Sequence, residues 1–109
     1  MHRLFLAALF CACAMPAWAD ELIPCSTTIG ATAVAVPFGS RAPTQYLEIC
    51  NAHATNTLGV NATGGTAVIG ASGTRTLAPG GCAIWTTLPP TDVSVIGSAA
   101  STTFACGFR

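Results

Sequence analysis

Four cysteines constrain the fold of this chain more than any other feature of its sequence. Cys25, Cys50, Cys82 and Cys106 are spread over the part of the chain that follows an apolar leader. An even set of cysteines in a short exported chain is typical of a domain held by disulfides, and four cysteines allow three connectivities. We favour Cys25–Cys106 and Cys50–Cys82, because the first and last strands of closed β-architectures are often neighbours. A metal site is not expected, since the set has no C-x-x-C pair and no companion histidines.

The start of the chain has the three-part layout of a secretory signal peptide. A basic Arg3 precedes an apolar run over residues 4–15, and Ala17-Trp18-Ala19 forms an A-x-A cleavage site. The apolar run is too short to span a bilayer, which needs about 20 residues. We therefore expect residues 1–19 to be a signal peptide and residues 20–109 to form one domain. The expected location is secreted or periplasmic in a bacterium, with no membrane contact after the leader is removed.

The surface of the domain is expected to be almost uncharged. Charged residues make up 7% of the chain, lysine is absent and the formal net charge is +0. Without a basic cluster, the sequence has no electrostatic footprint for nucleic-acid binding. Solubility of a free monomer normally depends on net charge, so a surface of this kind suits a protein packed into an assembly or wall. A low-charge secreted domain is the equally acceptable alternative.

Short runs of β-branched and aromatic residues alternate with turn residues along the whole mature chain. No segment has apolar residues at helical spacing over three turns, so the pattern predicts about seven or eight short strands. The expected fold is all-β, a small antiparallel β-sandwich of jelly-roll type or a small barrel. The expected strands span residues 32–36, 45–51, 58–62, 66–69, 74–77, 82–86, 92–97 and 102–108.

A turn at Ala78-Pro79-Gly80-Gly81 is the most clearly specified local structure. Proline presets φ at the first corner and glycine adopts positive φ without steric cost. We expect a β-hairpin over residues 74–86 around this turn. Period-two alternation in residues 45–51 places Leu47 and Ile49 on the core face and Cys50 on the other. The expected core consists of Leu47, Ile49, Leu58, Val60, Ile84, Val93, Val95, Phe104 and Phe108.

Residues that could perform catalysis are scarce. His53, in a polar loop, and Asp92 could contribute to a triad, but the chain has no G-x-S-x-G elbow. Glu48 and Asp92 are the acids inside the domain, and a glycosidase needs two carboxylates facing one cleft. Trp85 is expected to pack in the core. The sequon at Asn61 matters only in a eukaryotic secretory pathway, and the alanine-rich leader looks bacterial. We expect no enzymatic activity and no cofactor.

Five motifs follow one another along the chain in a set order. They are Tyr46-Leu47-Glu48-Ile49-Cys50-Asn51, Asn56-Thr57-Leu58-Gly59-Val60-Asn61, Gly64-Gly65-Thr66-Ala67, Leu77-Ala78-Pro79-Gly80-Gly81 and Val93-Ser94-Val95-Ile96-Gly97-Ser98-Ala99-Ala100. In this order they resemble the small β-sandwich proteins and domains of tailed-phage structural modules, of the decoration or tail-fibre-associated type. The resemblance covers most of residues 32–104 and implies a role at a virion or particle surface without catalysis. The signal peptide and the paired cysteines depart from the phage pattern.

The sequence therefore predicts an exported, non-catalytic structural or binding module stabilised by disulfides. The alternative is a phage virion-associated protein, and a small secreted enzyme or inhibitor is the third hypothesis. A protein, cell-surface or particle partner is expected, and a homo-oligomer or lattice is compatible with the low charge. Because loops on a rigid scaffold carry recognition, we expect binding at loops 52–57 and 88–91 at one end of the sandwich. The candidate binding residues in these loops are His53, Asn56, Pro89 and Pro90.

Overall fold

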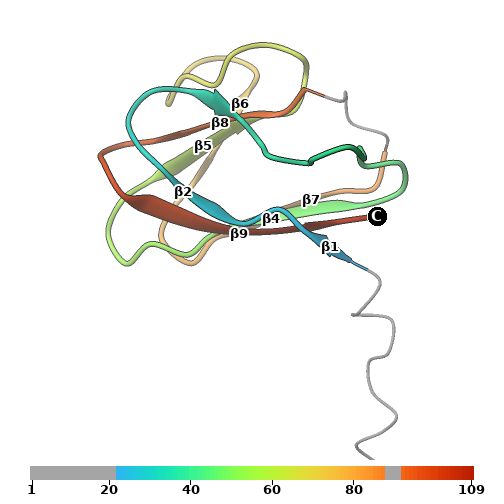
Figure 1. The fold of residues 1–109 in the computed structure, drawn as a ribbon. Helices are drawn as coiled ribbons and strands as arrows, with labels where there is room; N and C mark the ends of the chain where they lie inside the picture. The colour runs from blue at the N-terminus through green and yellow to red at the C-terminus, as the bar shows by residue number, and fades with distance from the viewer. Residues whose placement is uncertain (1–21, 88–91) are drawn as a thin grey trace, which may run out of the picture.

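The computed structural model describes residues 22–87 and 92–109, which form two antiparallel sheets packed face to face (Figure 1). The expected all-β sandwich is confirmed. No helix in the described part of the chain is long and apolar enough to cross a membrane. The strands are β1 (Ile23–Pro24), β2 (Thr27–Ile29), β3 (Val34–Ala35), β4 (Leu47–Asn51), β5 (Leu58–Asn61), β6 (Thr74–Leu77), β7 (Cys82–Trp85), β8 (Ser94–Gly97) and β9 (Thr102–Phe108).

Each sheet is assembled from strands that are distant in the sequence. Sheet A has the order β1-β9-β4-β7, with β2 also paired to β9, and sheet B has the order β3-β8-β5-β6. Burial alternates strictly in β4, and in β9 residues 102, 104, 106 and 108 are buried. This alternation is expected for strands with one face on a core and one toward solvent. The outer face of sheet A is therefore largely solvent-facing.

The core lies between the two sheets and contains every expected core residue except one. Leu47, Ile49, Phe104 and Phe108 contribute from sheet A and are fully buried. Ile84, in contrast, is 49% exposed, so its assignment to the core was wrong. The remaining members of the core include Leu58, Val60, Leu77, Ala83, Val93 and Val95, with Trp85 packed against them and partly buried.

The orientation of β7 explains why Ile84 points outward. Cys82 lies directly opposite Cys50, which is on the solvent side of β4. Ile84 shares a face with Cys82 because successive side chains in a strand alternate. Ala83, between them, faces the core and is 2% exposed.

The turn at residues 78–81 was predicted correctly, but the hairpin around it was not. The amide of Gly81 donates to the carbonyl of Ala78 at 2.8 Å, and Gly80 has φ of 82°. With Pro79 at the preceding corner, this is a type II turn. However, β6 pairs with β5 in sheet B, whereas β7 pairs with β4 in sheet A. The turn thus carries the chain from one sheet to the other.

Hydrogen bonds from Asn51 hold the turn between β6 and β7 in place. Its side-chain amide donates to the carbonyls of Leu77 at 3.0 Å and Asn56 at 2.7 Å, and it is 1% exposed. Its backbone amide donates to Gly81, and its carbonyl accepts from the amide of Gly80. Asn51 therefore satisfies the carbonyl at the end of β6 and fixes the turn to the end of β4.

Residues 66–69, expected to be a strand, form no strand in the structure. Glycines follow them closely, with Gly70 and Gly73 both at φ of 86°, and short turns replace ladder pairing. The segment folds over the outer face of sheet B, where the amide of Ala67 donates to Ser94 Oγ at 2.9 Å. Ile69 lies against Gly59 of β5, which has no side chain to hold it away. The segment thus covers the middle of the outer face of sheet B, at β5 and β8.

The other expected strands are present, with ends within two residues of those expected. Two short strands, β1 and β2, were missed by the sequence analysis. Pro24 and the break at Cys25-Ser26 interrupt the apolar pattern there, so neither strand is long enough to show a periodicity. Their pairing with β9 is specified by the tertiary structure.

A substitution at Gly97 tests the turn that links β8 to β9. A Cβ on Gly97 would collide with Thr102, 2.6 Å from its Cβ, and lie 3.1 Å from the carbonyl oxygen of Ala99. Thr102 cannot retreat because it is fully buried and donates to Ala99 at 2.8 Å. We expect Gly97→Ala to lower the free energy of unfolding by about 2 kcal/mol, measured by chemical denaturation.

The matched control for this prediction is Gly30→Ala. A Cβ on Gly30 would meet nothing within 4 Å, although Gly30 is hydrogen-bonded to Gly97 through its carbonyl. Gly30→Ala should therefore change stability little. Equal effects of the two substitutions would contradict the packing described for Gly97.

Candidate functional site

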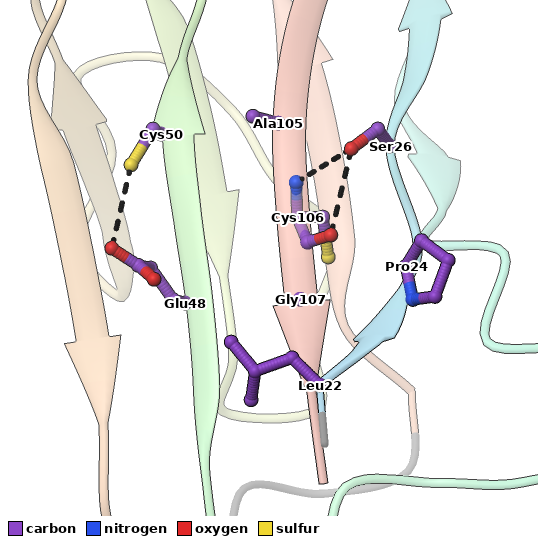
Figure 2. Close-up of a pocket in the computed structure, with 8 residues that line it drawn as sticks. All are labelled: Leu22, Pro24, Ser26, Glu48, Cys50, Ala105, Cys106 and Gly107. Carbon is purple, nitrogen blue, oxygen red and sulfur yellow. Dashed lines mark hydrogen bonds between the residues drawn. The ribbon is translucent and has the colours of Figure 1, made fainter. Parts of the chain in front are cut away.

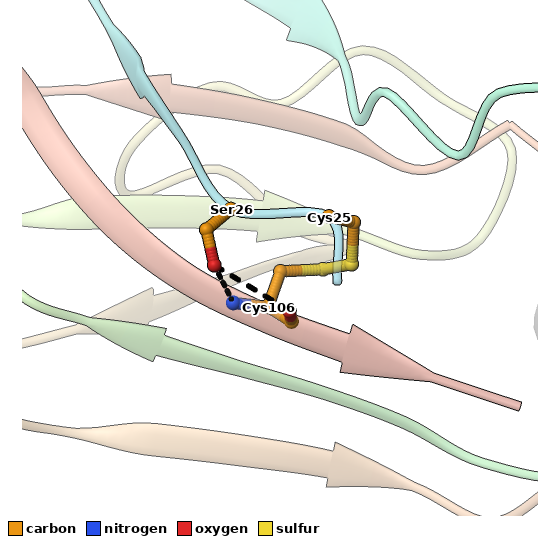
Figure 3. The surroundings of a disulfide bond; sticks show 3 residues. All are labelled: Cys25, Ser26 and Cys106. Atoms are coloured by element: carbon orange, nitrogen blue, oxygen red, sulfur yellow. Dashed lines mark hydrogen bonds between the residues drawn. A yellow bond between two sulfur atoms is a disulfide. The ribbon is translucent and has the colours of Figure 1, made fainter. Parts of the chain in front are cut away.

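The first disulfide, Cys25–Cys106, fastens the N-terminal strands to β9 (Figure 3). The two residues lie opposite each other, with Cα atoms 4.8 Å apart, and the amide of Cys25 donates to the carbonyl of Cys106 at 3.0 Å. Their exposed fractions are 3% and 8%, so this disulfide belongs to the core. At the break between β1 and β2, the hydroxyl of Ser26 accepts from the amide of Cys106 at 2.9 Å.

The second disulfide, Cys50–Cys82, lies on the outer face of sheet A. It joins directly opposite residues of β4 and β7, with Cα atoms 3.9 Å apart. Cys82 is exposed and Cys50 is half-buried. Both expected pairings are confirmed, and they differ in environment, because one disulfide is buried and the other faces solvent.

Glu48 lies beside the second disulfide. One of its carboxylate oxygens is 3.8 Å from the sulfur of Cys50 (Figure 2). Because that sulfur is bonded to Cys82 it has no proton to donate, so the contact is a close approach rather than a hydrogen bond. The ligand atoms of Glu48, Cys50 and Cys82 lie within 4.8 Å of one another. The covalent bond between the two sulfurs removes the thiolates that a metal would require.

A shallow groove runs along the outer face of sheet A (Figure 2). Its floor is formed at Ala105 and Gly107 of β9, whose small size leaves space above the sheet. Pro24 borders one side and Glu48 the other, and Leu22 lies against Gly107 at one end. The groove has a volume of about 300 Å³, and among the described residues that line it Glu48 is the charged one.

The sequence analysis missed this groove, although a signal for it was present. Large residues at positions 104 and 108 of β9 alternate with Ala105 and Gly107. In a strand, such alternation puts the small residues together on the opposite face. Leu22 and Pro24 gave no comparable signal, because their position beside Gly107 depends on the pairing of β1 with β9.

The two candidate binding residues in loop 52–57 are engaged within the loop itself. His53 Nδ1 accepts from the amides of Thr55 at 3.1 Å and Asn56 at 2.9 Å, which orients the ring. The side-chain amide of Asn56 donates to Thr102 Oγ1 at 2.9 Å and to the carbonyl of Ala100 at 3.3 Å. These contacts shape the loop and hold it against the β8–β9 turn. The prediction that this loop binds a partner stays a prediction.

The second candidate loop, residues 88–91 with Pro89 and Pro90, lies outside the described residues. Loop 52–57 follows the end of β4. The expectation that both loops lie at one end of the sandwich stays a prediction.

Comparison with known proteins gives no further guide to function. No family model, curated protein or solved structure matches this chain. The features of the chain that bear on its function are the two disulfides, the uncovered outer face of sheet A and the edges of the sheets.

The acceptor for N-linked glycosylation is inaccessible. Asn61 is 5% exposed, and its Oδ1 accepts from the amide of Thr63 at 2.9 Å and from the hydroxyl of Thr63 at 2.7 Å. This is an Asx turn, in which the side chain holds its own loop. The sequon therefore has a structural role in this fold.

A second hollow, of about 410 Å³, lies at residues 35–42 and Asp92. Phe38 anchors this segment, with its ring 5.0 Å from the ring of Phe108 at an interplanar angle of 71°. Apart from Asp92, the described residues of the wall belong to one continuous segment, the end of β3 and the loop that follows it. Binding sites usually combine polar groups from several elements. This hollow therefore resembles a binding site less than the groove on sheet A does.

Proposed function

We propose that this protein is an exported, non-catalytic structural or binding module stabilised by its two disulfides. The solvent-facing Cys50–Cys82 disulfide is the observation that carries the proposal. In a reducing cytoplasm, the two cysteines of an exposed disulfide would be kept as free thiols. In the periplasm or outside the cell, the disulfide persists. The predicted signal peptide at residues 1–19 supports the same location.

The outer face of sheet A is the contact surface in this proposal. The segment that includes Ala67 and Ile69 covers the middle of the outer side of sheet B, at β5 and β8. Sheet A presents the groove, the Cys50–Cys82 disulfide and the exposed side chain of Ile84 on its outer side. An uncovered face with so little charge suits contact with another protein surface.

The alternative is a component of a phage particle, as the resemblance of the motifs implies. A nearly uncharged outer face also suits a protein packed into a lattice, since there is little repulsion between copies. The two hypotheses place the protein in different fractions of the producing cell. One fractionation experiment therefore distinguishes them.

The test is to express the full chain in its native bacterial producer, to induce any prophage there, and to follow the protein through the cell fractions by mass spectrometry. We expect it in the periplasm or the medium, beginning at Asp20, and lighter than the reduced chain by two hydrogens for each disulfide. A variant lacking residues 1–19 is the control and should remain in the cytoplasm with free thiols. Recovery in sedimented particles would support the alternative, and reduced protein in the cytoplasm of cells making the full chain would contradict both the export and the disulfide argument.

A further inference from the structure

The exposed edges of the two sheets differ in how they are protected against pairing with another strand. Proteins usually protect such edges with charged residues, proline or very short strands. The edge of sheet A at β1 contains Pro24 and is broken before β2. In sheet B, β3 is two residues long and β6 carries the exposed Arg75. The edge at β7 has none of these features, and it displays Ile84 at 49% exposure.

The hydrogen-bond pattern of sheet A determines which backbone groups of β7 face away from the sheet. Tyr46 and Arg109 exchange hydrogen bonds between β4 and β9, and the amide of Ala52 donates to the carbonyl of Thr103. Even-numbered residues of β4 therefore bond to β9. Odd-numbered residues bond to β7, as the bond from the amide of Asn51 to the carbonyl of Gly81 confirms.

The same alternation applies to β7 itself. Leu47 lies opposite Trp85 and Ile49 opposite Ala83, so the backbone groups of Ala83 and Trp85 face β4. The N–H and C=O groups of Cys82 and Ile84 point the other way. Within the described residues, no strand pairs with this side of β7. β7 thus presents two complete donor and acceptor sets separated by one residue.

We propose that two copies of this protein pair through β7 in an antiparallel arrangement, with a two-fold axis at Ala83. Cys82 of one copy then lies opposite Ile84 of the other, and each such pair exchanges both of its backbone hydrogen bonds. The arrangement is self-complementary, as a closed two-fold interface requires. It rests on the proposed structural role, since it specifies what the module assembles with.

The side chains of β7 favour a second copy as the partner. The strand has no charged residue, so two identical strands meet without repulsion. On the outer face, Ile84 of one copy is placed beside the Cys50–Cys82 disulfide of the other and covers apolar surface that is exposed in the monomer. Pairing joins the two A sheets into one continuous sheet, which doubles the uncovered outer face.

Substitutions at Ile84 test the pairing without disturbing the ladder inside each copy. Ile84→Pro removes an N–H that points away from β4, and proline is tolerated at such a position of an edge strand. Ile84→Lys introduces the charge that protected edges carry. Ile84→Thr is the matched control, because it keeps the β-branched shape and the N–H group. Each variant is purified as the oxidised mature chain and analysed by sedimentation velocity over a concentration series.

We expect the unsubstituted protein to be a reversible dimer, and Ile84→Pro and Ile84→Lys each to raise its dissociation constant about tenfold or more. Ile84→Thr should raise it by about threefold or less. The thermal midpoints of the diluted monomers should agree within a few degrees, which shows that each variant still folds. In hydrogen exchange, the amide of Ile84 should exchange more slowly as concentration rises, while that of Ala83, bonded to β4 in both states, should not change.

A protein that is monomeric over the whole concentration series would overturn the proposal. A dimer that Ile84→Pro and Ile84→Lys leave unchanged would overturn it too, since the interface would then lie elsewhere. These measurements use purified protein and do not depend on where the chain is located in the cell. Failure of the dimer and failure of export can therefore be told apart.

Discussion

Replacing Cys25 and Cys106 together by alanine is expected to lower the free energy of unfolding by about 4 kcal/mol. This disulfide joins residues 81 apart, so in its absence the unfolded chain gains the conformational freedom of a long loop. Both sulfurs are also buried, so truncation leaves unfilled space beside Ile49, which lies opposite Cys106. A domain of this size has a total stability of roughly 5–13 kcal/mol, so the loss is a large fraction of the total.

The matched control for this prediction is the double replacement of Cys50 and Cys82 by alanine. Its loop is shorter, with a separation of 32, and its sulfurs face solvent, so we expect a loss of about 3 kcal/mol and no cavity. Guanidinium unfolding of both variants and of the oxidised parent provides the comparison. A larger loss in the control than in the buried pair would contradict the burial argument.

Asn51→Ala is expected to lower the free energy of unfolding by about 3 kcal/mol, although the residue contributes nothing to the apolar core. The change leaves the carbonyls of Leu77 and Asn56 without their donor, and the amide of His53, 2.9 Å from Asn51 Oδ1, without its acceptor. Buried polar groups that lose their partners cost about 1–3 kcal/mol each, and part of this cost is recovered where water enters. Denaturant unfolding measures the loss.

Asn56→Ala provides the control for the Asn51 prediction. The side chain of Asn56 lies in the same loop and donates two hydrogen bonds, but it is only half-buried, so water can replace it. We expect a loss of about 1 kcal/mol. If Asn51→Ala were no more damaging than Asn56→Ala, Asn51 would not be the residue that holds the sheet-to-sheet turn in place.

The disulfides and most of the core could be predicted because they depend on local or strongly constrained patterns. Alternation in β4 and β9 is long enough to assign each residue to a face, and Leu47, Ile49, Phe104 and Phe108 are buried as expected. Four cysteines in one small domain leave few ways to pair. The candidate site was less predictable, because the groove requires β1 to lie beside β9, and no local pattern specifies that pairing.

Ile84 was wrongly assigned to the core, although two other features of the sequence together specify its orientation. Alternation puts Cys50 on the face of its strand opposite Leu47 and Ile49, and Cys50 is expected to pair with Cys82. Together these two predictions require Cys82 to face solvent, and Ile84 with it, because side chains two apart share a face. The exposure of Ile84, on which the dimer proposal depends, could therefore have been predicted from the sequence.

Local sequence is enough to specify where the chain bends and which faces of its long strands are apolar, because backbone preferences and period-two alternation act over a few residues. Pro79 and Gly80 specify their turn in this way. The tertiary structure alone decided which sheet each strand joins. A turn fixes the direction of the chain but not its hydrogen-bond partners, and the carbonyl at the end of β6 is satisfied by Asn51, 26 residues away in the sequence, rather than by β7. The hydrogen-bond partners of a strand are selected by competition among all the strands of the folded chain. A local segment contains no information on that competition.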